Sequence, residues 1–217
     1  VSAINSLVGS SSSDWVGMGG VTALSNGNYV INSSYWNGYT GAVTWGNGAT
    51  GTTGVVSAAN SLIGTVNGEE VGNAGVVALP SGNYLARSPK WNQDRGAVTW
   101  ADGDTGITGE ISSANSLVGG TSGDRVGSNL AAPGGVAVLS NGNYVVSSPA
   151  WQITFGQYVG AVTWGNGGTG VTGVVSAANS LIGNSTGDMI GLLRQGNPNP
   201  LDGIIPLSDG NYLVASG

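Results

Sequence analysis

The sequence predicts an all-β repeat protein built from four-stranded antiparallel units. Residues 160–183, GAVTWGNGGTGVTGVVSAANSLIG, repeat residues 41–64 with only two changes, and residues 96–119 are a more divergent copy. A second motif of the type GGVxxLSNGNYVV alternates with the first. Repetition of this kind is typical of arrays whose units bury their hydrophobic faces by packing on their neighbours.

The composition favours short strands joined by tight turns. Of the 217 residues, 41 are glycine and 7% are charged, and the glycines follow no G-X-Y period. The formal net charge is −6, so we expect neither nucleic acid nor anionic membranes as partners. No apolar run approaches the ~20 residues of a membrane helix, so we expect no membrane insertion.

The residue types available restrict catalysis. Cysteine and histidine are absent, which excludes disulfides, thiol nucleophiles, imidazole bases and the usual zinc ligands. Paired carboxylates hydrolyse glycosides without histidine, and Asp102, Asp104 and Glu110 are close in sequence. Because other copies have turn residues there, we interpret these three as solvated turn charges. We expect no enzyme activity, no catalytic residues and no cofactor.

The repeats divide the chain into a single domain with incomplete ends. Residues 1–9 match the end of the 24-residue motif and predict a lone closing strand. The predicted organisation of residues 1–217 is then a closing strand at 1–9, units at 19–64, 74–119 and 134–183, and a partial fourth unit at 202–217.

The two ends of the chain are expected to share one sheet, as strands from both termini do in propellers, because sheet edges are then not exposed. The shared unit lacks one Ala-Val-Thr-Trp strand. We expect that edge to be covered by a continuation of the polypeptide or by another copy of the protein.

An acidic connector precedes each predicted unit. It contains an acidic residue, a variable residue, an apolar residue and glycine, and the acidic residues are Asp14, Glu69, Asp124 and Asp188. A carboxylate beside glycine usually accepts backbone N–H bonds within a turn, and we interpret these residues in that way. Calcium is the alternative. It takes about 6–8 oxygen ligands, so it requires several of these loops to converge.

Each unit is predicted to open with a β-hairpin. Residues 21–24 and 29–32 flank Asn26-Gly27, a pair that tolerates the backbone angles of a two-residue type I′ turn. The corresponding pairs in the other copies are Ser81-Gly82, Asn141-Gly142 and Asp209-Gly210. The sequence therefore predicts four hairpins.

A loop of variable length follows each complete hairpin and carries a tryptophan. Exposed indole rings on a rigid β scaffold suit the stacking of sugar rings, and tyrosine hydroxyls nearby suit hydrogen bonding. The candidate ligand-binding residues are Trp36, Trp91, Trp151, Tyr35 and Tyr158. The alternative is that the loop tryptophans only seal the edges of the sheets.

A second hairpin is predicted to complete each unit, formed in the first unit by residues 42–45 and 55–62. Apolar residues on both sides of the latter strand predict that both faces of the sheet are buried. The strand tryptophans Trp45, Trp100 and Trp164 are then expected to fill gaps between sheets. These features favour a β-propeller of about four blades or a propeller-like array. A β-solenoid is the alternative, and a two-sheet sandwich explains the repetition less well.

Five motifs together carry a family resemblance. They are VSAANSLIG, GDxIG or GDxVG, GGVxxLSNGNYVV, SPxW and GAVTWGNG. The combination resembles the tandem repeats of very large bacterial secreted and surface proteins, including filamentous-haemagglutinin-like adhesins, and it covers the whole chain. The resemblance implies a secreted or cell-surface location and a role in adhesion, without a defined ligand.

The expected function is therefore that of a structural or assembling repeat module in a fibre, stalk or adhesin. Its expected partners are other copies of itself or adjacent repeats. A carbohydrate-binding, lectin-like module that uses the loop tryptophans is the alternative, with glycans as the partner. An enzyme is the least supported class, because near-identical copies favour the scaffold itself over an asymmetric catalytic site.

Overall fold

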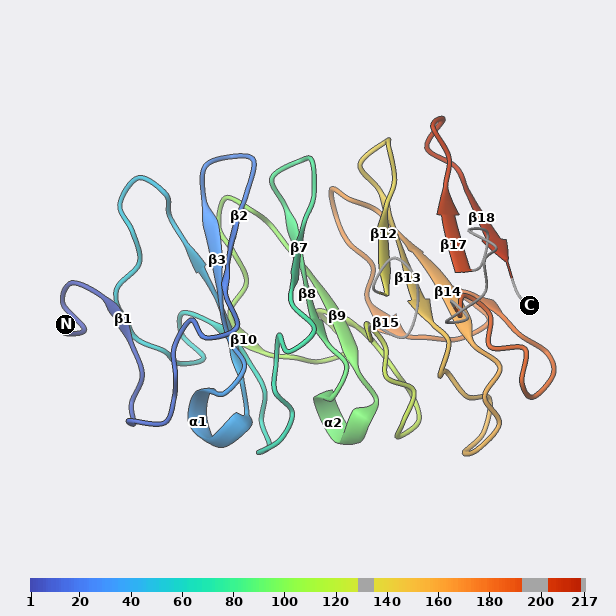
Figure 1. Cartoon of the computed structure of the whole chain (residues 1–217), viewed down its shortest axis with the longest axis horizontal. Helices are drawn as coiled ribbons and strands as arrows, with labels where there is room; N and C mark the ends of the chain where they lie inside the picture. Colours follow the sequence, from blue (N-terminus) through green and yellow to red (C-terminus); the bar gives the residue numbers. More distant parts are fainter. Residues whose placement is uncertain (129–134, 193–202, 216–217) are drawn as a thin grey trace.

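The computed structural model describes residues 1–128, 135–192 and 203–215. Residues 134, 202, 216 and 217, which begin or end the predicted third and fourth units, lie outside this part of the chain. Figure 1 shows small β-sheets standing side by side in a row, with the hairpin turns along one edge and longer loops along the other. The prediction of an all-β repeat protein is confirmed.

The three complete repeats share one order of strands, and the first two also contain a short helix. The first contains β2 (Val21–Ala23), β3 (Tyr29–Ser33), α1 (Trp36–Tyr39), β4 (Ala42–Gly46), β5 (Gly54–Val55) and β6 (Leu62–Ile63). The second contains β7 (Val76–Ala78), β8 (Tyr84–Ser88), α2 (Trp91–Asp94), β9 (Ala97–Ala101), β10 (Gly109–Glu110) and β11 (Leu117–Val118). The third contains β12 (Val136–Val138), β13 (Tyr144–Ser148), β14 (Ala161–Gly165), β15 (Gly173–Val174) and β16 (Leu181–Ile182). β1 (Leu7–Val8) precedes them, and β17 (Gly203–Pro206) and β18 (Tyr212–Ala215) follow.

The four predicted hairpins are confirmed as β2–β3, β7–β8, β12–β13 and β17–β18. Their predicted turn type is wrong. The Leu24 N–H donates to the Asn28 carbonyl at 2.8 Å and the Gly27 N–H donates to the Leu24 carbonyl at 3.1 Å, which leaves a three-residue loop. Gly27 has a φ of +89°, whereas Asn26 is not among the residues with positive φ. A type I′ turn needs positive φ at both central positions, so this loop instead fits a type I turn that ends in a left-handed glycine.

The predicted second hairpin is also wrong in part, because the expected strand at residues 55–62 is divided in two. β6 pairs antiparallel with β4 as expected, but β5 pairs with β1 in parallel. Asn60 forms the turn between β5 and β6. Its Oδ1 accepts the Ser57 N–H at 2.9 Å and its Nδ2 donates to the Val55 carbonyl at 3.0 Å. Ala58 and Ala59 are exposed in this turn and not buried.

Parallel strands connect each repeat to the next. β10 of the second repeat pairs with β6 of the first, and β15 of the third pairs with β11 of the second. The Gly109 N–H donates to the Ser61 carbonyl at 3.0 Å and the Gly173 N–H donates to the Ser116 carbonyl at 3.0 Å. Each five-stranded sheet therefore takes its fifth strand from the following repeat.

The predicted closure of the two ends is wrong for the described residues. Residues 1–9 do not join the C-terminal hairpin, since β1 pairs with β5 and the two ends of the chain lie at opposite ends of the row in Figure 1. The Gly54 N–H donates to the Ser6 carbonyl at 3.1 Å and the Val56 N–H donates to the Val8 carbonyl at 3.0 Å. β1 thus occupies the place that β6 and β11 occupy at later junctions.

The hydrophobic core lies between sheets, as the two-sided burial predicts. All five residues of β13 are buried. Tyr144 and Val146 pack in a cluster with Leu85 of the second repeat, whereas Val145 between them packs in a cluster with Ile204 of the C-terminal hairpin. Alternate residues of one strand therefore serve two neighbouring interfaces.

The strand tryptophans also lie between repeats. The Trp45 Nε1–H donates to the Gly103 carbonyl at 2.8 Å, and the Trp100 Nε1–H donates to the Gly167 carbonyl at 3.0 Å. A Cβ atom on Gly106 would lie 2.5 Å from the Trp45 Cβ, so only glycine permits this close packing. The expected gap-filling role is confirmed for Trp45 and Trp100. Trp164, in contrast, is 44% exposed.

We expect Trp100→Phe to lower the free energy of unfolding by about 0.5–1.5 kcal/mol, because the phenyl ring keeps the packing but loses the hydrogen bond to Gly167. Trp164→Phe is the matched control, since the Trp164 indole is exposed and its Nε1–H donates to no acceptor among the described residues, and we expect it to be nearly neutral. Urea denaturation of both variants measures the difference. Equal losses would contradict the assigned role of the carbonyl contact.

Candidate functional site

The longer loops on the edge opposite the hairpin turns contain an uncommon backbone conformation. α1 and α2 are single turns whose interior residues have left-handed angles, with φ of +47° at Asn92, +59° at Gln93 and +60° at Asp94. For residues other than glycine this conformation costs roughly 1–2 kcal/mol each. The surrounding contacts must therefore hold these loops in place.

Buried carboxylates supply part of that support. Glu69 Oε2 accepts the N–H groups of Thr65 at 2.6 Å and Val66 at 3.1 Å, and Oε1 accepts the Asn92 N–H at 3.1 Å. Asp14 and Asp124 make the corresponding bonds to the N–H groups of Asn37 and Gln152, at 3.0 and 3.1 Å. The interpretation of these acidic residues as acceptors of backbone bonds is confirmed.

Asp188 and Asp102 also hold backbone N–H groups. Asp188 accepts the N–H groups of Asn184 and Ser185 from its own connector. Asp102 Oδ1 accepts the N–H groups of Asp104 and Thr105 within an exposed turn, as the interpretation as turn charges predicts. That interpretation is wrong for Glu110, which is exposed but lies in β10. Within residues 1–128, 135–192 and 203–215, no three Asp or Glu side chains are grouped closely enough to hold a metal ion.

The buried carboxylates predict an order of protonation. Burial raises the pKa of Asp14, but hydrogen bonds from Ser11, Asn37 and Ser10 outweigh that effect, so the pKa lies below its ordinary value of 3.8. Burial is the largest effect at Asp124 and raises its pKa, against hydrogen bonds from Thr121, Gln152 and Gly120.

On acidification we expect the folded protein to protonate Asp124 before Asp14. Asp14 stabilises the fold above the unfolded pKa of about 3.9, and this contribution is lost as the pH falls through its lower folded pKa. Ionised Asp124 lowers the free energy of unfolding, because the folded state binds its proton at a higher pH than the unfolded state does. Carboxyl ¹³C NMR titration measures both midpoints, and the reverse order would contradict the prediction.

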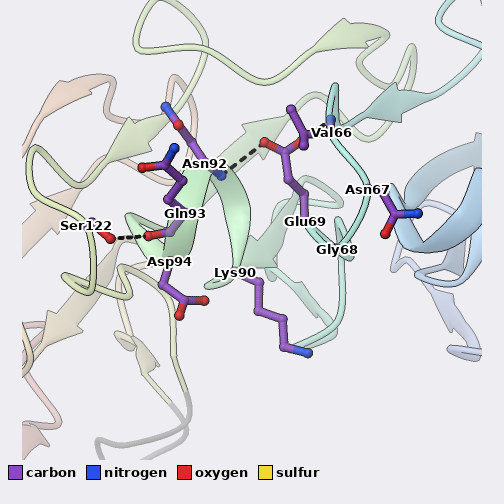
Figure 2. A pocket seen from close by; sticks show the side chains of 9 residues that line it. All are labelled: Val66, Asn67, Gly68, Glu69, Lys90, Asn92, Gln93, Asp94 and Ser122. Carbon is purple, nitrogen blue, oxygen red and sulfur yellow. Dashed lines mark hydrogen bonds between the residues drawn. The ribbon is translucent and has the colours of Figure 1, made fainter.

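A polar groove of about 410 Å³ lies between the loops of successive repeats. Figure 2 shows its lining residues, which come from the connector after the first repeat, from the α2 loop and from the connector after the second repeat. The lining residues are Val66, Asn67, Gly68, Glu69, Lys90, Asn92, Gln93, Asp94 and Ser122.

The groove offers hydrogen bonds more than charge. Lys90 Nζ is 2.7 Å from a carboxylate oxygen of Glu70, and the carboxylate of Asp94 is 3.3 Å from a guanidinium nitrogen of Arg125, so these four charges are paired. The Ser122 hydroxyl donates to the Gln93 carbonyl at 2.8 Å (Figure 2). The exposed amide side chains of the α2 loop provide further donors and acceptors, an arrangement that suits a neutral polar ligand.

Comparison with known families agrees with the repeat architecture. The model of a repeat of unknown function (DUF5650) matches residues 1–18, 23–73, 78–128 and 138–192. The chain belongs to the DUF5650 repeat family. The search of curated proteins found no match. Each longer match extends past the acidic connector, and so includes the bridge by which the connector pairs with the loop of the same repeat, as Val71 does with Gly41.

The loop tryptophans are not exposed binding platforms in this DUF5650 chain. Trp36, Trp91 and Trp151 are only 7%, 8% and 8% exposed. Trp91 packs in one cluster with Val30 and Val43 of the preceding repeat. The prediction that these indoles present open faces to a ligand is therefore wrong, and the alternative that they seal the sheets agrees with their burial. Burial of their apolar surface between repeats removes it from water and stabilises the fold.

The two predicted tyrosines are more accessible. Tyr158 is exposed in the loop after Trp151, and Tyr35 is half-buried beside Trp36. The ring of Tyr35 makes edge-to-face contacts with Trp15 and Tyr39, at centroid distances of 5.4 and 5.3 Å. Trp15 and Tyr39 are both exposed, so these three residues form an aromatic cluster at the loop edge.

The tryptophan loops alone do not predict the aromatic cluster or the groove, because both depend on variable positions outside those loops. In the DUF5650 repeats, the residue after the anchoring carboxylate is Trp15, Glu70, Arg125 or Met189, and each of these has positive φ. This position differs in every repeat while the flanking acidic and apolar residues keep their character. Variation within a fixed motif was the available signal for the surface that distinguishes one repeat from another.

Proposed function

We propose that this chain is a structural, assembling module, in which DUF5650 repeats form one continuous and stiff array. The observation that carries the proposal is the parallel strand pairing at each junction, which makes the sheet of one repeat depend on two residues of the next. In repeat proteins of this kind each repeat contacts only its neighbours, so the array extends in one direction.

Three kinds of contact resist rotation at a junction. Besides the parallel strands, the Asn92 N–H donates to Glu69 Oε1 at 3.1 Å along the loop edge. Near the hairpin turns, the Trp45 indole donates to the Gly103 carbonyl. Because these contacts lie at separate heights of the sheet, a hinge at the junction requires all of them to break. This arrangement supports a role in length or presentation.

An open row is the arrangement that we favour for longer arrays. It is close to the β-solenoid alternative, with each repeat as one coil, whereas a propeller of about four blades requires the row to curve until its ends meet. Small-angle X-ray scattering of this chain and of a tandem fusion with additional DUF5650 repeats tests the proposal. We expect the maximum dimension to grow by a constant step per repeat at constant cross-section. A dimension that stops growing would support a ring, and an increasing cross-section would indicate a flexible string.

A secreted or cell-surface location in bacteria and a role as part of an adhesin belong to the same proposal. The similarity of the motifs to repeats of large surface proteins supports them. The carboxylates described here hold loops and turns, which supports a role without enzyme activity. Among the described residues, no helix has the length and apolar character needed to cross a membrane. Fractionation of the producing cells, with antibody detection of the chain, tests the location.

Glycan binding is a second candidate, supported by the aromatic cluster of Trp15, Tyr35 and Tyr39. Exposed aromatic rings held at fixed angles provide apolar faces for sugar rings. A glycan array probed with the wild type and with Trp15→Ala tests this candidate. We expect Trp15→Ala to abolish any specific signal. A signal that survives Trp15→Ala but is lost with Asn92→Ala would place binding in the polar groove.

A further inference from the structure

The C-terminal end of the row exposes residues that are buried at both internal junctions. Leu181 in β16 is 54% exposed, whereas Leu62 and Leu117 at the same position are fully buried. Leu213 in β18 is 53% exposed, whereas Leu85 and Val145 are fully buried. Trp164 is also exposed, whereas Trp45 and Trp100 at the same position are partly buried. The three exposed side chains belong to the third repeat and to the C-terminal hairpin.

Polar groups at this end lack the partners that their counterparts have. The Trp100 indole and the Asn83 side chain both donate to the Gly167 carbonyl, at 3.0 Å each. In the described part of the chain, neither the Trp164 indole nor the Asn143 amide nitrogen donates to such an acceptor. Among the described residues, Asp188 accepts backbone bonds only from its own connector, whereas Asp124 also accepts the Gln152 N–H from the following loop.

Backbone edges complete the pattern. β6 and β11 each pair on one side with the strand of their own repeat and on the other with a parallel strand of the next. β16 pairs with β14, and β18 pairs with β17; no second strand pairing is present for either among the described residues. An edge with exposed leucines is a template for further strand pairing.

We infer that this C-terminal face binds a further DUF5650 segment. That segment contains, in order, a loop tryptophan, an AVTW strand, a glycine turn and a Gly-Val strand. The inference rests on the proposed array function and on continuity with the two internal interfaces. The segment's AVTW strand pairs antiparallel with β18, as β4 pairs with β3. Its Gly-Val strand pairs parallel with β16, as β10 pairs with β6. A carbonyl of its glycine turn accepts from Trp164 and Asn143.

The chain itself provides the test segment. Gly217 aligns with Ser34, so a copy of residues 35–57 joined after Gly217 continues the pattern in register. Hydrogen exchange of β16 and β18 is compared between the original chain, this extended chain and a chain carrying a shuffled 23-residue extension. We expect exchange in β16 and β18 to slow by about tenfold or more only with the matching extension.

Leu181→Asp provides the matched variant. We expect it to leave the stability of the unextended chain nearly unchanged, because Leu181 is exposed there, and to remove the protection in the extended chain. Unchanged exchange in the extended chain would overturn the inference, and so would equal protection by the shuffled extension. Protection of the unextended chain that rises with concentration would also overturn it, by identifying a second copy as the occupant. If scattering still shows a stiff row in any of these cases, the proposed array function stands and only the inferred binding to the C-terminal face is wrong.

Discussion

Trp91→Ala is expected to lower the free energy of unfolding by about 3–5 kcal/mol, the usual loss for truncating a buried aromatic residue. The indole is only 8% exposed and packs with residues of two repeats, so its removal leaves a cavity at their junction. Chemical denaturation followed by far-UV circular dichroism measures the loss.

Phe155→Ala is the control for this variant. Phe155 is an aromatic residue of the third repeat's loop but is exposed, so its truncation is expected to change stability by no more than about 0.5 kcal/mol. A loss below about 1 kcal/mol for Trp91→Ala would mean that the indole is not part of the core and would revive its interpretation as a binding platform.

Gly96→Ala is expected to disrupt the packing of the second repeat's connector against its loop. Gly96 has a φ of +78°, and an added Cβ would lie 2.3 Å from the Val126 nitrogen and 2.5 Å from the Val126 oxygen. Left-handed geometry alone costs alanine roughly 1–2 kcal/mol, and displacement of the Val126 backbone adds to this cost. A lower denaturation midpoint, with faster hydrogen exchange at residues 123–127, measures the effect.

Gly68→Ala separates the two causes. Gly68 has a φ of +91°, but its added Cβ would meet no atom within 4 Å. This variant is therefore expected to show the conformational cost without the steric cost. If Gly68→Ala and Gly96→Ala lose equal stability, the close approach of the connector backbone to Gly96 contributes nothing.

Much of the fold was predictable from local patterns. The Gly-Asn-Tyr motifs specify hairpins, and these form as predicted because turn chemistry and strand alternation act over few residues. The anchoring role of Asp14, Glu69 and Asp124 was likewise predictable, because an acidic side chain in a turn-rich connector bonds mostly to nearby backbone N–H groups.

The parallel junctions and the burial of the loop tryptophans were not predictable in the same way. A largely apolar segment such as residues 54–63 does not reveal that Asn60 divides it, or that its first half pairs with another repeat. Trp91 follows Ser-Pro-Lys in a polar loop, and only the neighbouring repeat provides the apolar surface that covers it. These features depend on contacts between repeats, whereas the motifs describe each repeat alone.

The shared strands also constrain how such a gene changes length. The segments at residues 41–64 and 160–183 are nearly identical and both span the junction strands, so recombination between them exchanges one junction for an equivalent one. A deletion of this kind removes two whole repeats and preserves the pairing partner of every remaining strand. Duplication likewise adds repeats that reuse the existing interface, so no new interface has to evolve. Array length can therefore vary among descendants while every internal contact stays the same.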